Sequence, residues 1–329
     1  MTWINFVTKT DQRPLWSCHE AFFSYNTEMV ERRLVMYERV TSPTFLEKLT
    51  ARWQQDRFVC IGLDIDYQQL PAIVKKQRTI EEAIFTFNRM IIDATANLVC
   101  AYKPNSAFYE AYGEAGIRAL SKTISYSREN FPHIPIILDA KRADIGSTNR
   151  GYVLSAFDQL GVDAITVHPY LGKEALAPFL ERKDKGIIVL AKTSNLGSGE
   201  FQDLLVGEDQ VPLYEVVARN VAQYWNGNGN CGLVVGATYP SELRRVRELV
   251  GDMPLLIPGI GAQGGDVAAT VAAGRDSRGW GMMLNSSRGI IYASRGDDFA
   301  RAAYVATVKL GDEINACRVK DTRRSKNIG

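Results

Sequence analysis

The chain has 329 residues, 46% of them hydrophobic and 23% charged, which is the composition of a globular protein with a sizeable core. Its 39 basic residues nearly balance 37 acidic residues, so the net charge of +2 gives no general electrostatic reason to bind nucleic acid or a membrane. The sequence has no apolar run long enough to span a bilayer and no signal-peptide pattern, so we expect a cytoplasmic protein.

Residues 1–42 fit no regular pattern. They are rich in aromatic and charged side chains, and the sequence TSPT at positions 41–44 is typical of a boundary before a helix at 45–55. We interpret residues 1–42 as an N-terminal extension, either flexible or an artefact of start-codon choice, with regulation or partner binding as the alternative. Residues 43–320 would form the main domain and 321–329 a C-terminal tail.

Eight short apolar runs follow along the chain. They are nearly all apolar instead of alternating with polar residues, which is typical of parallel strands that are covered on both faces. The runs occupy residues 58–64, 98–103, 135–139, 162–168, 186–193, 231–236, 253–258 and 279–284.

Helical patterns separate these runs. They occupy residues 80–96, 109–129, 147–160, 172–180, 213–225, 241–249, 264–273 and 299–318. Regular alternation of strand and helix predicts an α/β fold, a (β/α)8 TIM barrel. A doubly wound parallel sheet is the alternative that strand counting leaves open.

The five cysteines are odd in number and widely spaced, and none forms a CxxC pair. Cys60, Cys100 and Cys231 lie inside predicted strands, so we expect buried free thiols. The three histidines are scattered along the sequence, so a metal site built on histidines is not expected.

The most informative segment is IILDAKRADIGSTNR at residues 136–150. Asp139 and Lys141 are two positions apart at the end of a predicted strand, so their side chains should point the same way. Asp144 follows in the loop before the next helix. Because nearby carboxylates stabilise an ammonium group, Lys141 suits a fixed cation and proton donor. The alternative is a surface ion-pair network of little energetic value.

Charged residues also end two other predicted strands. Asp64 ends the first and Lys103 the second. A single charged residue at the end of an apolar strand often serves only solubility. Together with Asp139, Lys141 and Asp144, however, these two residues form a set of alternating negative and positive charges. The carboxyl ends of barrel strands carry the active site, so these residues predict a catalytic rim.

Two segments near the C-terminal end of the barrel suggest a phosphate site. PGIGAQGG at residues 258–265 offers backbone N–H groups before a helix, and NSSRG at 285–289 supplies Arg288. A guanidinium can bind two phosphate oxygens at once. The alternative is an ordinary barrel turn beside a surface arginine.

Taken together, these motifs resemble the orotidine 5'-phosphate decarboxylase family over roughly residues 45–318. The strongest match is Asp139-Ala-Lys-Arg-Ala-Asp-Ile145 followed by Gly146-Ser-Thr148, and AYKPN and LAKTSN resemble its longer bacterial and protozoan branch, type 2. The resemblance implies a cofactor-free TIM-barrel enzyme that converts orotidine 5'-phosphate (OMP) to UMP and CO2. It also implies a homodimer with shared active sites.

The family's catalytic roles can be carried over residue by residue. Lys141 would donate a proton to C6 of the pyrimidine, and Asp139 would lie beside the substrate carboxylate. Asp144 and Thr148 would cross the dimer interface into the neighbouring site. Lys103 would take part in the charge network.

The resemblance also implies substrate contacts. Asp64 would hold ribose hydroxyls together with Lys103, and Ser194 would contact the pyrimidine edge, with Thr193 or Asn195 as alternatives. Gln263 and Arg288 would bind the phosphate. The remaining expected contacts are those of Asn105, Ile145, Gly261 and Ser287.

Two other functions compete with this interpretation. A magnesium-dependent hexulose-phosphate synthase or keto-gulonate-phosphate decarboxylase would share the third-strand motif, and a non-catalytic phosphate-binding barrel would share the phosphate turn. Magnesium dependence, or binding without turnover, would identify them. We expect no metal and no cofactor, because the sequence contains no HExxH and no GxGxxG after the first strand.

Overall fold

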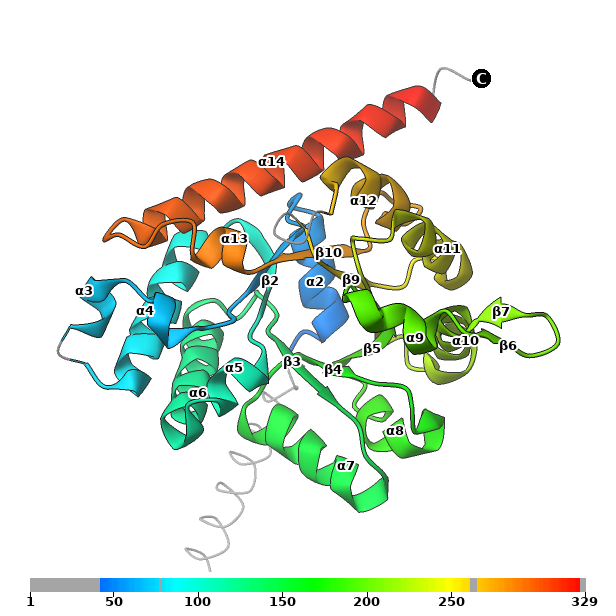
Figure 1. Cartoon of the computed structure of the whole chain (residues 1–329), viewed down its shortest axis with the longest axis horizontal. Coiled ribbons are helices and arrows are strands. Elements are labelled where there is room, and N and C mark those ends of the chain that lie inside the picture. Colours follow the sequence, from blue (N-terminus) through cyan, green and yellow to red (C-terminus); the bar gives the residue numbers. More distant parts are fainter. Residues whose placement is uncertain (1–41, 77, 261–264, 326–329) are drawn as a thin grey trace, which may run out of the picture. The chain divides into compact units, whose positions relative to one another are not determined.

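Eight parallel strands form the centre of the computed structural model, which describes residues 42–76, 78–260 and 265–325 (Figure 1). The strand order in the sheet is β2-β1-β10-β9-β8-β5-β4-β3. The strands are β1 (Val59–Gly62), β2 (Val99–Lys103), β3 (Ile137–Arg142), β4 (Ala164–Val167), β5 (Gly186–Lys192), β8 (Cys231–Val235), β9 (Leu255–Pro258) and β10 (Met282–Ser286).

The sheet closes on itself between β2 and β3. Parallel bridges join Tyr102 to Ile136 and Asn105 to Asp139. The Asp139 N–H donates to the Pro104 carbonyl at 2.9 Å, which continues this contact beyond the end of β2. The predicted TIM barrel is therefore confirmed, and the doubly wound sheet, which stays open at two edges, is wrong.

Helices surround the barrel. α14 packs against α4 and α12, α4 against α6, and α11 lies between α12 and α10. The helices are α4 (Ile80–Thr95), α5 (Ser106–Glu110), α6 (Gly113–Asn130), α7 (Gly146–Val153), α8 (Gly172–Leu180), α10 (Leu213–Asn220), α11 (Pro240–Val250), α12 (Val267–Gly274), α13 (Arg288–Ile291) and α14 (Phe299–Ser325), with short helices α3 (Ala72–Lys75) and α9 (Gly199–Gln202).

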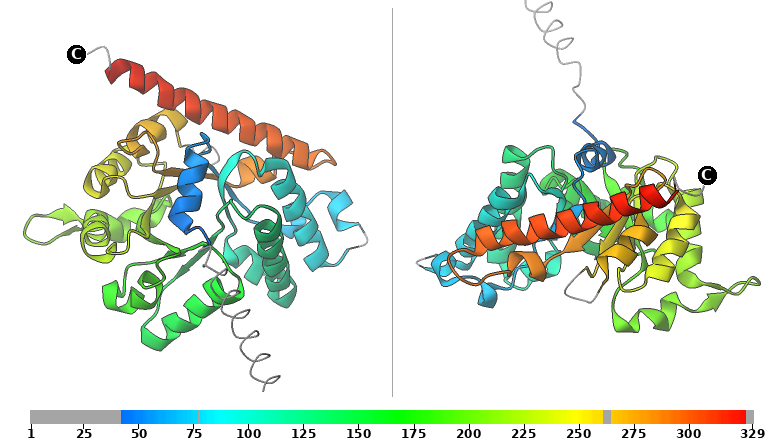
Figure 2. Two further views of the ribbon diagram at one scale, coloured as in Figure 1. Left: turned by 180° about the vertical axis from the view of Figure 1, so that it is seen from behind. Right: turned by 90° about the horizontal axis from the view of Figure 1, so that it is seen from above.

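One further helix, α2 (Phe45–Trp53), covers the end of the barrel where the strands begin (Figure 2). Thr44 and Glu47 form a capping box at its start. The Trp53 indole donates to the carbonyl of Met282 at 2.8 Å, and the Arg52 guanidinium donates to the carbonyl of Val99 at 2.8 Å. Both acceptors begin strands, so α2 closes the amino-terminal mouth and leaves the opposite end for a site.

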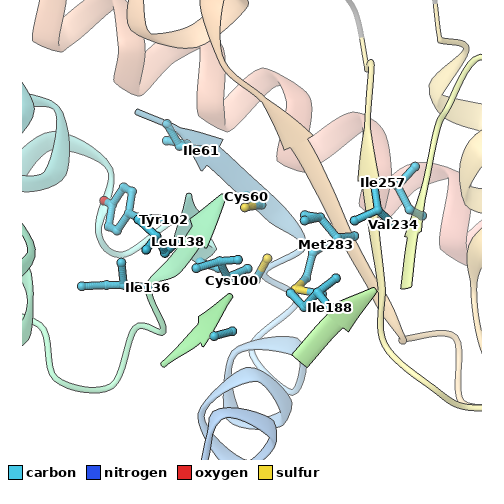
Figure 3. Packing of buried hydrophobic residues seen from close by; sticks show 14 of the residues in the cluster. Cys60, Ile61, Cys100, Tyr102, Ile136, Leu138, Ile188, Val234, Ile257 and Met283 are labelled. Atoms are coloured by element: carbon cyan, nitrogen blue, oxygen red, sulfur yellow. The ribbon is translucent and has the colours of Figure 1, made fainter. Parts of the chain in front are cut away.

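The core fills the barrel and the space below its helices. Cys60, Ile188, Val234, Ile257 and Met283 are among its buried side chains, all 6% exposed or less (Figure 3). The thiols of Cys60, Cys100 and Cys231 are buried and free, as predicted. Burial raises the pKa of the Cys60 thiol to about 12, so this sulfur is an inert hydrophobic group.

Several predicted boundaries were wrong by a few residues. β3 continues to Arg142 and thus includes both Asp139 and Lys141, and β10 begins three residues later than predicted, at Met282. The predicted helix at 109–129 is split between α5 and α6 at Gly113, whose φ of +56° favours glycine. An unpredicted hairpin, β6 (Leu205–Val206) and β7 (Val211–Pro212), follows β5.

The proposed N-terminal extension lies almost entirely outside the described residues, so its boundary at residue 42 stays a prediction. The helix α14 runs to Ser325, beyond the predicted start of the C-terminal tail at residue 321. In the part of the chain that the structure describes, every helix is too short or too polar to cross a membrane.

Candidate active site

The Asp139 carboxylate is the centre of a charged network at the carboxyl ends of the strands. Its Oδ2 accepts from Lys103 Nζ at 2.8 Å, and its Oδ1 accepts from Lys141 Nζ at 2.6 Å. The Thr166 hydroxyl, which belongs to none of the motifs described above, also donates to Oδ1 at 2.8 Å, and the Asn105 amide donates to Oδ2 at 3.4 Å. The predicted proximity of Asp139 and Lys141 is confirmed.

Burial makes this network strongly electrostatic. Burial alone would raise the pKa of Asp139, but the attraction and hydrogen bonds of Lys103 and Lys141 hold it well below its ordinary value. Burial alone would lower the pKa of Lys103, but Asp64 and Asp139 raise it above its ordinary value. Both groups therefore carry their full charges throughout the physiological pH range.

Lys141 is held in an unusual backbone conformation. Its φ is +46°, in the left-handed region that non-glycine residues rarely adopt, and the pairing of β3 with β4 shifts register between Leu138 and Arg142. The Lys141 N–H donates to Thr166 Oγ1 at 3.0 Å, which fixes this irregularity. The bulge keeps the Lys141 side chain, 48% exposed, over the barrel opening beside Asp139.

Asp64 lies on the other side of Lys103. Its Oδ2 accepts from the Ser287 hydroxyl at 2.7 Å, and its Oδ1 is 3.9 Å from Lys103 Nζ. A Cβ at Gly62 would stand 1.8 Å from the Ser287 hydroxyl oxygen, so only glycine in β1 leaves room for this contact. Charge thus continues from Lys141 through Asp139 and Lys103 to Asp64.

Two adjoining cavities open over this network. The larger, about 430 Å³, is lined by Lys141, Thr193 and Asn195 above an apolar floor of Leu190, Val234 and Leu256. The smaller, about 170 Å³, is lined by Asp64, Gly259, Ile260, Asn285, Ser286, Ser287 and Arg288. Lys103, Asp139, Ser194 and Pro258 line both cavities, so one elongated ligand could occupy the two together.

Arg288 is a second cation of the smaller cavity, besides Lys103. It is exposed at the start of α13, and its guanidinium forms no ion pair with any described residue. Gly259 has a φ of +100° and turns the chain away from β9. The predicted contacts Gly261 and Gln263 lie outside the described residues, so their place in the phosphate site stays a prediction.

Ser194 follows β5 and stands against β8. A Cβ at Gly236 would lie 2.9 Å from both Cα and Cβ of Ser194, so the absent side chain of Gly236 sets this approach. The Thr193 hydroxyl donates to the Asn195 side chain at 2.7 Å, whereas no hydrogen bond of the Ser194 side chain to a described residue is present. Of the three candidates, Ser194 has its hydroxyl available for a ligand.

The loop that carries Ser194 is anchored by a second buried lysine. Lys192 is 1% exposed, and its Nζ is 2.5 Å from Asp203 Oδ1 and 4.7 Å from the centre of the Tyr239 ring. Gln202, next to Asp203, accepts from the Thr193 N–H at 2.9 Å. These contacts join both ends of the segment after β5.

Asp144, Ile145 and Thr148 stand apart from the network of their own chain. The Asp144 carboxylate accepts from the Ile145 N–H at 2.7 Å, and the Asp144 N–H donates to Asn149 at 2.8 Å. Ile145 is 62% exposed, and these three residues are absent from the lining of both cavities. Their predicted action in a neighbouring subunit's site stays a prediction.

Sequence reasoning missed Thr166, Lys192 and Asn285. Thr166 and Lys192 lie in strands whose sequences are apolar runs, and it is the pairing of β4 with β3 that brings Thr166 against Asp139. Alternation along β10 could have indicated Asn285, which is two positions from the interior residue Met283. Among the described residues, no group of three or more His, Cys, Asp or Glu side chains is arranged to hold a metal ion.

The fold and the site define a (β/α)8-barrel enzyme with a buried Lys–Asp network beside a cavity that an arginine also lines. The sequence model of the "Orotidine 5'-phosphate decarboxylase / HUMPS family" matches residues 57–303. The chain belongs to this family.

Named relatives agree. The chain is 53% identical over 276 residues to the orotidine 5'-phosphate decarboxylase of Janthinobacterium sp. (strain Marseille), covering 83% of this chain and 98% of that protein. The solved OMP decarboxylase of Leishmania donovani is 39% identical with a TM-score of 0.71, covering 84% of this chain and 99% of that one. The UMP synthase of L. donovani is 41% identical with a TM-score of 0.74, but this chain spans only 57% of it.

Proposed function

We propose that this protein decarboxylates orotidine 5'-phosphate to UMP and CO2 in pyrimidine biosynthesis. The observation that carries the proposal is the position of Lys141, whose ammonium lies 2.6 Å from Asp139 and lines the larger cavity. The family and the decarboxylases named above support the same reaction.

The nucleotide would lie across both cavities. The phosphate would meet Arg288 in the smaller cavity, since a guanidinium binds phosphate oxygens in pairs. The pyrimidine would occupy the larger cavity, with its edge at Ser194 and its reacting carbon near Lys141 and Asp139. Lys103 lines both cavities, and Asp64, 3.9 Å from it, lines the smaller one, so the ribose would lie beside these two residues.

Decarboxylation breaks the bond between C6 and the carboxylate carbon. The electron pair stays on C6 in an orbital that the ring carbonyls cannot delocalise, so the protein must stabilise a localised negative charge. A preorganised ammonium at Lys141 supplies that stabilisation, and then donates its proton to C6 to give UMP. Lys141 regains a proton from water before the next turnover.

Asp139 would lie beside the substrate carboxylate. Its carboxylate is fixed by Lys103, Lys141 and Thr166, so it cannot turn away from an incoming substrate carboxylate. The like charges repel each other until the C6–carboxylate bond breaks, when the negative charge passes to C6 beside Lys141 and CO2 leaves as a neutral molecule. Leu190, Val234 and Leu256 form the apolar part of the larger cavity, which Asp139 also lines.

We also propose a homodimer with shared sites. Asp144 and Thr148 would enter the partner's site, which is supported by the exposure of the neighbouring Ile145 and by the absence of all three from the cavities of their own chain. The reduced, buried thiols of Cys60 and Cys231 support a cytoplasmic enzyme.

The decisive test is an ultraviolet assay of OMP turnover with purified protein, run with EDTA and again with added Mg²⁺. We expect the same rate in both. Turnover that requires Mg²⁺, or binding of UMP without turnover of OMP, would replace the proposal with one of the two competing functions.

Shared sites can be tested by mixing inactive variants. Lys141→Ala and Asp144→Ala homodimers should each be inactive, but mixed dimers contain one site with neither substitution. Recovery of up to about a quarter of wild-type activity after refolding an equal mixture is therefore expected. No recovery in a mixture that mass spectrometry proves to be heterodimeric would refute the shared site.

A further inference from the structure

Asn285 is a buried polar residue to which the reaction above gives no role. It lies in β10, is 7% exposed, and its Oδ1 has no hydrogen-bond partner among the described residues. A buried acceptor without a donor destabilises a folded protein, and such groups in native proteins usually have a specific reason. The side chain lines the smaller cavity, so the reason can be a ligand.

The position of Asn285 restricts which part of a nucleotide it can meet. In the barrel register it stands between Cys60 of β1 and Pro258 of β9. Its cavity is lined by Arg288, and also by Lys103 and Asp139, which it shares with the larger cavity. A ligand whose phosphate meets Arg288 and whose base lies above Asp139 places its sugar between them.

A second unpartnered acceptor belongs to the same cavity. Asp64 Oδ1 is also buried without a hydrogen bond, since Lys103 Nζ is 3.9 Å away. A phosphate dianion offers no protons to such acceptors, and the pyrimidine N–H belongs to the other cavity. A ribose offers two hydroxyl donors on adjacent carbons, as many as the buried acceptors without a partner among the described residues of this cavity.

We propose that Asn285 accepts a hydrogen bond from one ribose hydroxyl of the substrate and thereby favours ribonucleotides over deoxyribonucleotides. The inference rests on the proposed function and extends it to the sugar. A site that satisfies its own buried acceptor only when a hydroxyl is present discriminates against the analogue that lacks it. Asn285 is thus a specificity-determining residue, and it takes no part in the chemistry at C6.

The experiment compares Asn285→Leu with wild type on three substrates. Leucine has nearly the shape of asparagine without its polar atoms. The substrates are OMP, 2'-deoxy-OMP and 3'-deoxy-OMP, and kcat/KM is measured for each. We expect Asn285→Leu to lower kcat/KM for OMP roughly 3- to 10-fold, the worth of one neutral hydrogen bond. For the analogue that lacks the accepted hydroxyl, wild type and variant should agree.

The melting temperature separates this role from a structural one. Removing an unpartnered buried acceptor should leave the melting temperature of Asn285→Leu equal to or above that of wild type. A structural asparagine would lower it and reduce kcat/KM with all three nucleotides alike, which would overturn the inference. Should the leucine variant fail to fold, Asn285→Ala, which only deletes atoms, gives the same comparison.

Asn230 provides a matched control. It is also 7% exposed with an unpartnered Oδ1, but it precedes β8 at the opposite end of the barrel and donates to the carbonyls of Arg182 and Lys185. Asn230→Leu should lower the melting temperature without changing the preference for OMP over its deoxy analogues. Equal changes of preference in both variants would overturn the inference.

The outcomes also separate this inference from the proposed function. Wild-type protein that fails to turn over OMP refutes the function. Wild-type protein that turns over OMP, while Asn285→Leu affects all three nucleotides equally or none, refutes only the ribose contact.

Discussion

Replacing Lys103 with methionine tests whether the buried charge network behaves as its geometry implies. Lys103 is 3% exposed, and its Nζ lies 2.8 Å from Asp139 and 3.9 Å from Asp64. At an effective dielectric constant of about 20, these distances correspond to attractions of about 6 and 4 kcal/mol, which offset the cost of burying the ammonium. Methionine keeps the volume of the side chain and removes both attractions.

The substitution leaves Asp139 with Lys141 as its only ammonium partner among the described residues, and that side chain is half exposed. Breaking a buried ion pair in this way costs about 3 kcal/mol of unfolding free energy at neutral pH. Urea denaturation of Lys103→Met and wild type would measure the difference. A difference below about 1 kcal/mol would refute the view that this pair is effectively buried.

The pH dependence of this difference is a second test. Asp139 has a depressed pKa in the folded protein, so its stabilising effect is present above the unfolded pKa and is lost as the pH falls through the folded one. In Lys103→Met the depression is weaker, and protonating Asp139 beside a methionine costs little. The pKa of Asp139 in the unfolded chain is the same for both proteins, so the stability difference should stay constant from pH 7 to about pH 4 and shrink at lower pH, where Asp139 is protonated in the variant before it is protonated in wild type. A difference that stays constant down to the lowest pH at which both proteins fold would contradict the assignment.

A matched control is Lys122→Met. Lys122 pairs with the carboxylate of Glu81 at 2.5 Å, but its side chain is 53% exposed. Exposed pairs contribute little, so this variant should lose much less stability than Lys103→Met and keep full activity. Replacing Lys103 and Asp139 together by Met and Leu should restore stability without activity, since apolar groups can substitute for a buried pair.

Three further substitutions probe the catalytic roles. Lys141→Ala should lower kcat by at least ~10⁴-fold, because both proton donation and electrostatic stabilisation are lost. Calorimetry should still detect binding of UMP to this variant. Activity within tenfold of wild type would exclude Lys141 as the proton donor. Arg288→Ala should raise KM for OMP by ~10- to 100-fold, because contacts to the phosphate are lost. Arg295 is an exposed arginine in the next loop, and Arg295→Ala should leave KM unchanged. Equal KM values for the two variants would refute the phosphate site. Gly236→Ala should push the Ser194 backbone away and lower kcat/KM by ~10- to 100-fold. Gly227 has open space around it, so Gly227→Ala should have no effect. A fully active Gly236→Ala variant would refute the requirement for this position of Ser194.

The sequence determined most of the barrel. Apolar runs without alternation indicated parallel strands covered on both sides, and all eight occur in the structure, because burial on both faces leaves no polar positions in such strands. The local spacing of Asp139 and Lys141 also predicted their contact, since both side chains leave the same strand. The end of β3 did not follow from the apolar pattern, because the bulge at Lys141 extends this strand beyond its apolar residues.

Only the tertiary structure decided which distant residues complete the site. Thr166 reaches Asp139 because β4 pairs with β3, and Ser287 reaches Asp64 because β10 pairs with β1 across more than two hundred residues of sequence. The unpartnered state of Asn285 is likewise a property of packing, because a hydrogen bond is present or absent according to what surrounds the side chain in space. Sequence spacing determines the contacts made along one strand, whereas the pairing of strands that are distant in sequence determines the contacts made between strands.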